Sequence, residues 1–505
     1  MNSLKEPPET GEPPAGSELL VRRIGLALGP LFFVAFLLIP NGLSSLPGHG
    51  AHAAYAAGVA SMMAIWWLTE AFPIAWTACV PLVAYPLLGV HGKGFVGGAR
   101  ASAEPYVDAY IFMFLGGMAI GAAMEEQGLH RRIALHVMRA LGMGPRRLLL
   151  GVLVSTAIVS LWISNTATAV MMMPIALALL KSVERAEGRR LDHFGSAVML
   201  GVAYAANVGG IGTKIGSGTN SIFCGFVSDK LHQDISFLSY MAFGLPFVVL
   251  MIPIVWGMLW LEARRDAIGS GPGRDVLDAE LAALGPLVGP ERQVAVIFGA
   301  AAAFWVLGDL IRPLWAPTVS GLLGGVKIAG KHHEAAVAML AGATLLALRA
   351  LTFRAFLRIP WGTLLLLGGS FSMAAGIEAS GLATWLQRAL ADVSAMPEIA
   401  QVGVAAAATV ALSAVASNTA AVNVILNVLP RNLAALSATA IGASCDFALP
   451  AGTPPNAIVF GSGRIRLRTM MRVGVVLDLI AIVVTTVYVW AWGARALGLT
   501  PGVSD

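Results

Sequence analysis

Long apolar segments recur along almost the whole sequence, and they constrain the fold more than any other feature. Of the 505 residues, 57% are hydrophobic and only 12% are charged, whereas a soluble protein carries about 25% charged residues. A helix of about 20 apolar residues can cross a bilayer, because it satisfies its backbone polar groups internally. The sequence therefore predicts an all-α polytopic membrane protein.

Eleven apolar segments are candidates for membrane-spanning helices. They cover residues 24–40, 53–72, 74–91, 108–138, 195–228, 240–262, 293–312, 334–351, 361–385, 437–462 and 472–495. Basic residues favour the cytoplasmic side, so Arg22 and Arg23 place the N-terminus inside. Eleven spans then leave the C-terminus outside. The net charge of +5 does not indicate nucleic-acid binding, because Lys and Arg gather at segment ends.

Two copies of one polar tripeptide interrupt this apolar pattern. They are Ser164, Asn165 and Thr166, and Ser417, Asn418 and Thr419. Polar side chains at bilayer depth cost free energy and therefore need a reason. Basic residues flank the stretch 148–183 at both ends, so it must enter and leave on one side of the membrane. The stretch 398–432 has the same build, and we expect two re-entrant hairpins with a triplet at each tip.

The two halves of the chain carry the same elements in the same order. LGGMAIGAAMEEQGL at 115–129 resembles LGGSFSMAAGIEASGL at 367–382. In each half a hairpin follows, and then a helix broken by a polar loop, at 195–228 and at 437–462. Because the halves are oppositely oriented, they form an inverted repeat, which favours a binding site between the repeats near the membrane midplane.

This repeat divides the chain into four parts. We expect a disordered tail at 1–20, a first repeat at 21–262, a cytoplasmic linker at 263–292 and a second repeat at 293–505. The linker is polar and contains three residues typical of loops, Gly269, Gly271 and Pro272.

The two tips suit a small anion with a negative charge at each end. Where the second leg of a hairpin begins, unpaired backbone N–H groups and the helix dipole attract negative charge. Hydroxyl and amide groups also bind carboxylates without a buried cation. Clusters of Ser, Thr and Asn in membrane helices often serve only to join neighbouring helices. The symmetric pairing of the two triplets nevertheless favours a binding site. The spans contain neither a nucleophile with its base nor a zinc-binding motif, so we expect a carrier and no enzyme.

Several motifs resemble the divalent anion/sodium symporter family, which contains the di- and tricarboxylate and sulfate transporters. The resemblance covers nearly all of the chain after residue 20. It includes WWLTEAFPIAWTACVPL at 66–82, both triplets, and ALPAGTPPNAIVFGSG at 448–463, the most specific motif. The resemblance implies a homodimer in the lipid bilayer. Each protomer would combine a scaffold domain with a transport domain that moves as a rigid body, in an elevator mechanism.

The resemblance also implies an activity and its residues. It implies sodium-coupled symport of C4-dicarboxylates (succinate, malate or fumarate) across the bacterial inner membrane, with no cofactor besides the coupling ion. A sodium-independent dicarboxylate exchanger, or a carrier of citrate, sulfate or another oxyanion, is the alternative. The substrate would meet Ser164, Asn165, Thr166, Ser417, Asn418, Thr419, Thr453 and Pro454. One sodium site would use Ser160, Ser164, Asn165 and Gly212. The other would use Ser413, Ala416, Asn418 and Gly452.

Two charged residues depart from the family pattern. Lys214 lies in GGIGTKIGSGTN at 209–220, where the family usually has an uncharged residue. Either it reaches solvent along its aliphatic stem, or it supplies the positive charge of a sodium ion, which would suit exchange without sodium. Asp446 precedes the second polar loop. It could balance Lys214, help to bind a cation, carry a proton, or only make a structural hydrogen bond.

Overall fold

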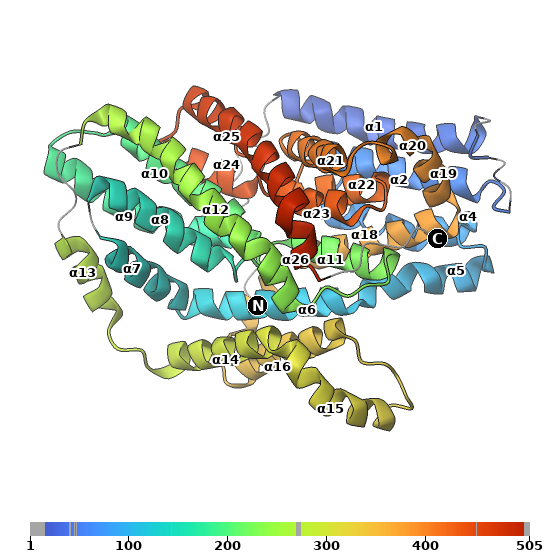
Figure 1. Ribbon diagram of the computed structural model, residues 1–505, viewed down its shortest axis with the longest axis horizontal. Helices are drawn as coiled ribbons and strands as arrows, with labels where there is room; N and C mark the ends of the chain where they lie inside the picture. The colour runs from blue at the N-terminus through green and yellow to red at the C-terminus, as the bar shows by residue number, and fades with distance from the viewer. Residues whose placement is uncertain are drawn as a thin grey trace, which may run out of the picture.

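The computed structural model describes residues 16–39, 42–44, 46, 48–142, 144–268, 274–450 and 452–498, and every regular element in these ranges is a helix (Figure 1). Six of these helices are long and apolar enough to cross a membrane, or seven if one bent pair forms a single span. This supports a helical polytopic membrane protein. The count of eleven stays a prediction, since several expected spans consist of two shorter helices.

The first helices of the chain pack against one another. They are α1 (Gly16–Leu38), α2 (His52–Thr69), α3 (Ile74–Thr77), α4 (Val80–Leu88), α5 (Gly94–Ala103) and the short η1 (Glu104–Val107). The longest two, α1 and α2, lie side by side, and α4 packs on α2 and α5. Of the expected disordered tail, residues 1–15 lie outside the described ranges, and residues 16–20 already belong to α1.

The expected span 108–138 is two helices, so predicting one continuous span was wrong. The helices α6 (Ala109–Glu126) and α7 (Leu129–Leu141) are separated by Gly128, whose φ is +77°. Glycine adopts this left-handed conformation readily and so ends a helix. The second repeat breaks in the same way at Gly381, whose φ is +78°, between α18 (Trp361–Ala379) and α19 (Leu382–Ala389).

Each half of the chain then contains a helical hairpin and a broken helix. The hairpins are α8 (Pro145–Ser160) with α9 (Asn165–Glu187), and α21 (Glu398–Ser413) with α22 (Asn418–Val428). The broken helices are α10 (Asp192–Gly210) with α11 (Gly218–Lys230), and α23 (Leu433–Gly442) with α24 (Pro454–Phe460). The elements therefore follow the predicted order in both halves.

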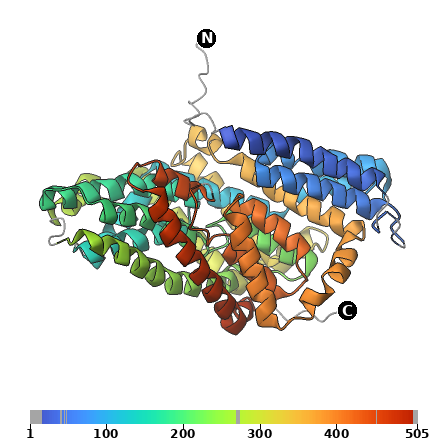
Figure 2. The same cartoon turned by 90° about the horizontal axis from the view of Figure 1, so that it is seen from above.

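The two halves interlock through these elements. Within each half, the broken helix packs on its own hairpin, α10 on α8 and α23 on α21. Across the halves, α9 packs on α24, and α22 packs on α11. Figures 1 and 2 both show α8 and α9 toward one end of the long axis, with α21 and α22 in the other half of the molecule. Each hairpin thus lies against the broken helix of the other repeat.

The remaining helices complete the bundle. They are α12 (Phe237–Ala263), η2 (Arg264–Asp266), α13 (Arg274–Leu284), α14 (Gly289–Val306), α15 (Gly308–Leu322), α16 (Gly330–Ala347), α17 (Phe353–Leu357), α20 (Ala391–Ser394), α25 (Leu467–Tyr488), η3 (Val489–Gly493) and α26 (Ala494–Ala496). Of the predicted linker, Gly269, Gly271 and Pro272 lie outside the described ranges. The linker's α13 packs on α7, where Asp278 pairs with Arg139 at 3.3 Å.

Candidate functional site

The polar triplets form the turns of the two hairpins. Ser164 is the N-cap of α9, and its Oγ accepts a hydrogen bond from the Ala167 backbone N–H at 3.4 Å. Ser417 caps α22 in the same way, accepting from Ala420 at 3.3 Å. Serine is a favoured N-cap, because its hydroxyl satisfies an N–H that the helix leaves unpaired. Each Asn and Thr therefore occupies the first turn of a helix.

A serine and an asparagine meet at each tip in the same way. Ser160 Oγ lies 3.0 Å from Asn165 Oδ1 and 2.7 Å from the Ala206 carbonyl oxygen. Ser413 Oγ lies 2.8 Å from Asn418 Oδ1 and 3.0 Å from the Ala443 carbonyl oxygen, just after α23. One hydroxyl proton can serve only one of two oxygens. At each tip one of the two oxygens is therefore left without the serine proton, and it could coordinate a hard cation such as sodium.

The two broken helices are held open by equivalent asparagines. Asn220 Nδ2 donates to two carbonyl oxygens of the first loop, those of Gly210 and Thr213, both at 2.7 Å. Asn456 Nδ2 donates to the backbone carbonyl oxygens at the same spacings in the second loop, those of Asp446 at 3.2 Å and Leu449 at 3.0 Å. Sequence reasoning gave these asparagines no role. Both end the polar loop of their repeat, and that shared position was the available signal.

Residues of the two repeats meet beside the tips. Asn207 of α10 donates from Nδ2 to Thr453 Oγ1, at 3.0 Å, in the second repeat. Gly218, at the start of α11, lies against Thr419 of the second tip, because a Cβ built on this glycine would be 3.5 Å from Thr419 Cγ2. The structure thus brings Thr419 and Thr453 next to first-repeat residues.

The candidate residues differ in their exposure. Thr166 and Pro454 are exposed, whereas Ser164, Asn165, Ser417, Asn418 and Thr419 are partly buried. The buried ones are Ser160, Gly212, Ser413, Ala416, Gly452 and Thr453. Most substrate candidates are therefore accessible, and the residues expected only in the sodium sites lie deeper. Of the latter, Gly212 packs beside the first tip, since a Cβ there would be 2.2 Å from Leu161 Cδ2.

Lys214 does not reach solvent, so the interpretation as a solvent-reaching lysine was wrong. Its side chain is 0% exposed, and its Nζ lies 2.6 and 2.9 Å from the two carboxylate oxygens of Glu334 on α16. It also donates to the Ile235 carbonyl and lies 5.5 Å from the centre of the Tyr110 ring. A buried charge requires such a partner. Sequence reasoning missed Glu334, which lies 120 residues away in the chain.

Asp446 is also buried, and its surroundings differ from those of Lys214. Neither of its carboxylate oxygens has a side-chain hydrogen-bond partner among the described residues, and the Ala448 backbone N–H lies close to the carboxylate. A second carboxylate, that of Asp478, interacts with it electrostatically and accepts a hydrogen bond from the Phe447 N–H at 2.8 Å. Lys214 is bound to Glu334, so Asp446 is not the partner that balances the lysine.

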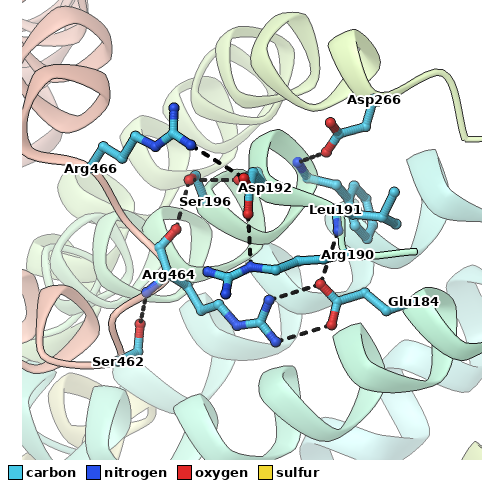
Figure 3. Close-up of polar contacts among 10 residues, drawn as sticks. Glu184, Arg190, Leu191, Asp192, Ser196, Asp266, Ser462, Arg464 and Arg466 are labelled. Atoms are coloured by element: carbon cyan, nitrogen blue, oxygen red, sulfur yellow. Dashed lines mark hydrogen bonds and ion pairs between the residues drawn. The ribbon is translucent and has the colours of Figure 1, made fainter.

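A polar cluster joins the base of the first hairpin to the segment after the second broken helix (Figure 3). Arg464 reaches from the α24–α25 connection to Glu184 on α9, with N–O distances of 2.8 and 3.0 Å. Its carbonyl oxygen accepts from Ser196 of α10 at 2.8 Å. Paired contacts between arginine and a carboxylate fix geometry as well as adding energy. This cluster ties the two repeats together away from the tips.

Comparison with known proteins identifies a matching family and several relatives of this chain. The model of the sodium:sulfate symporter transmembrane region matches residues 22–499. The sodium-dependent dicarboxylate transporter SdcS of Staphylococcus saprophyticus is 31% identical over 501 residues, covering 94% of this chain and 92% of that protein. SdcS of Staphylococcus aureus is 32% identical over 503 residues, with the same two coverages of 94% and 92%.

A solved structure agrees at the level of the fold. The Alcanivorax borkumensis YdaH transporter matches with a TM-score of 0.51, covering 95% of this chain and 98% of that one. Its sequence identity is only 14%, so this likeness concerns the fold alone. The family model and the SdcS relatives decide the family: this integral membrane chain belongs to the sodium:sulfate symporters, the divalent anion/sodium symporter family that its motifs resemble.

Proposed function

We propose that this protein is a secondary active transporter that carries C4-dicarboxylates such as succinate, malate or fumarate together with sodium ions. The observation that supports this most is the duplicated tip, in which a serine, an asparagine and a backbone carbonyl converge in both repeats. The SdcS relatives, which are named sodium-dependent dicarboxylate transporters, agree with it.

In this proposal the two helix N-termini at the tips bind the two ends of the substrate. The first turn of α9 offers Asn165 and Thr166, and the first turn of α22 offers Asn418 and Thr419. Backbone N–H groups and the helix dipole at these positions favour a carboxylate. Thr453 completes the site, held by Asn207. A dicarboxylate with charges at both ends fits this paired arrangement better than a single small anion.

Sodium ions travel with the substrate in this proposal and are bound behind the tips. The first site uses Ser160, Ser164, Asn165 and Gly212. The second site uses Ser413, Ala416, Asn418 and Gly452. Each site would place a positive charge beside the substrate, where the Asn side chain contacts both. Binding of sodium and dicarboxylate then becomes cooperative, because each reduces the electrostatic cost of burying the other.

We further propose an elevator mechanism in a homodimer. The hairpins and broken helices pack on one another across the repeats, which supports their movement as one transport domain. The remaining helices, including α1, α2 and α6, would form the scaffold in the bacterial inner membrane. The two hairpins would be re-entrant, the N-terminus cytoplasmic and the C-terminus outside, following the distribution of basic residues.

The ion pair at Lys214 favours sodium coupling over sodium-independent exchange. An exchanger in which Lys214 replaces a sodium ion needs an uncompensated positive charge. The Glu334 carboxylate is 2.6 Å from the lysine and balances that charge. Competition of citrate, sulfate or another oxyanion with succinate distinguishes a carrier of these larger or inorganic anions from a C4-dicarboxylate carrier.

Uptake by the purified full-length protein in proteoliposomes tests this proposal. Radiolabelled succinate uptake is measured with external sodium and with choline in its place, and unlabelled malate, fumarate, citrate or sulfate is added as competitor. We expect saturable, sodium-dependent uptake that malate and fumarate inhibit more strongly than citrate or sulfate. Uptake that is equal in choline would contradict sodium coupling, and stronger inhibition by citrate or sulfate would contradict the C4 assignment.

A further inference from the structure

Several buried side-chain oxygen atoms in and beside the second broken helix lack a side-chain hydrogen-bond partner among the described residues. Asp446 is 0% exposed, and neither of its carboxylate oxygens has a side-chain hydrogen-bond partner among the described residues. The Oδ1 atoms of Asn456 and Asn207, both also 0% exposed, lack partners as well. Buried acceptors without a donor cost free energy. A cluster of them therefore requires an explanation.

The internal repeat shows which residue Asp446 replaces. Asn220 and Asn456 hold their loops through carbonyls ten and seven residues earlier, so Asp446 corresponds to Gly210. The glycines 216 and 452 support this alignment, because each donates its backbone N–H to a carbonyl three residues earlier, at 3.4 Å. The second repeat thus carries a carboxylate where the first repeat carries no side chain.

The contacts made at these positions differ between the repeats, because Gly210 ends helix α10 whereas Asp446 lies in the loop after α23. A Cβ built on Gly210 would lie 2.1 Å from Asn165 Oδ1, so this position faces the asparagine of the first tip. In the second repeat the equivalent asparagine is Asn418. Asp446 Oδ2 packs against the bare backbone of Gly452, because a Cβ there would be 1.7 Å from this oxygen. The contact with Gly452 places the carboxylate beside a residue of the proposed second cation site.

We infer that the Asp446 carboxylate is a ligand of the second cation site, which is therefore anionic, whereas the first site is neutral. This inference rests on the proposed function, because it assigns a ligand to a site proposed there. A sodium ion accepts several oxygen ligands at once, whereas one proton would satisfy a single acceptor. The neighbouring Asp478 is not proposed as a ligand, since its Oδ1 is already bound to the Phe447 N–H.

The consequence is an order of binding. The second site attracts sodium without help from the substrate, because a fixed carboxylate already lies beside it. The first site has only neutral oxygens, and its affinity for sodium depends more strongly on a bound dianion. One sodium ion therefore binds to the empty carrier, and a second binds together with the dicarboxylate.

Sodium binding to the full-length protein in detergent, with no dicarboxylate present, tests this inference. Radioactive sodium binding and the melting temperature are followed as sodium replaces choline at constant ionic strength. The variants are Asp446→Asn, which keeps the shape, and Asp446→Gly, which copies the first repeat. Asp478→Asn is the control, because it removes a neighbouring buried carboxylate that is not proposed as a ligand.

We expect both Asp446 variants to raise the half-saturating sodium concentration by about tenfold or more, with the control close to wild type. Without sodium, Asp446→Asn should melt no lower than wild type, since it removes an unpaired buried charge, and this shows that the variant is folded. Unchanged sodium binding in Asp446→Asn overturns the inference, as does an equal shift in Asp478→Asn. If sodium-dependent succinate uptake persists in that case, only the inference fails, whereas sodium-independent uptake by wild type contradicts the proposed function itself.

Discussion

The ammonium group of Lys214 and the carboxylate of Glu334 form a buried ion pair between the first broken helix and α16. In the elevator proposal, Lys214 belongs to the moving domain and Glu334 to the scaffold. The pair would then have to separate or be shielded during each transport cycle. A contact of this kind influences which conformation is populated, as well as stability.

Removing one member of this ion pair should lower the stability more than replacing both members. Lys214→Met or Glu334→Gln alone should lower the stability by about 3–5 kcal/mol, because a single buried charge remains. The double variant Lys214→Met/Glu334→Met should recover most of the loss, since neither charge is left unpaired. Melting temperatures in detergent, with and without sodium, measure this. A double variant less stable than both single variants would contradict the pairing as described.

The equivalent asparagines of the two broken helices should contribute equally to stability and to uptake. Asn220→Ala and Asn456→Ala each leave two buried carbonyl oxygens without their donor, at a cost of about 1–3 kcal/mol. Uptake should also fall, because the loops that carry Gly212 and Thr453 lose their support. The control is Asn427→Ala, whose Nδ2 bonds, among the described residues, to Asn423 of its own helix. A loss restricted to one repeat would argue against equivalent roles.

The serines behind the tips should act on sodium more than on substrate. Ser160→Ala and Ser413→Ala should each raise the half-saturating sodium concentration several-fold, with a smaller change in the succinate KM at saturating sodium. Uptake measured as a function of both concentrations separates these effects. Ser155→Ala is the matched control, because Ser155 is buried in the hairpin of Ser160 and, among the described residues, its hydroxyl bonds to Val152 of its own helix, at 3.1 Å. Equal effects of all three variants would contradict a sodium role.

The features on which these predictions depend were only partly predictable from local sequence. The starts of α9 and α22 were predictable, because N-cap preference is local and Ser164 and Ser417 precede apolar helices. The break at Gly128 was also locally encoded, in a glycine that adopts a left-handed conformation, but the apolar run around it favoured one long helix.

The partners of the buried charges were not predictable in this way. Glu334 lies at the start of α16 and Lys214 in a loop of the other repeat, and only the packing of α6, α11 and α16 brings them together. Asp446 was visible as an unusual residue in an apolar segment. Its equivalence to Gly210 depends on side-chain hydrogen bonds of Asn220 and Asn456, which no local pattern reveals.

The polar cluster of Figure 3 should stabilise the association of the two repeats. Glu184→Gln should cost about 1.5–3 kcal/mol, because it replaces a charge-assisted pair with Arg464 that is only 12% and 16% exposed. Arg466→Gln should have little effect, since its pair with Asp192 is largely exposed, at 77% and 48%. Melting temperatures compare the two. A larger loss for Arg466→Gln would contradict the assigned importance of Arg464.

The most direct test of the central claim is concentrative transport driven only by a sodium gradient. Proteoliposomes with equal succinate on both sides receive an inward sodium gradient while the membrane potential is clamped. Our account predicts net succinate accumulation that collapses with the gradient and is lost in Asn165→Ala and Asn418→Ala. Accumulation that is absent in wild type despite succinate exchange, or that persists in both tip variants, would contradict sodium-coupled transport through the paired tips.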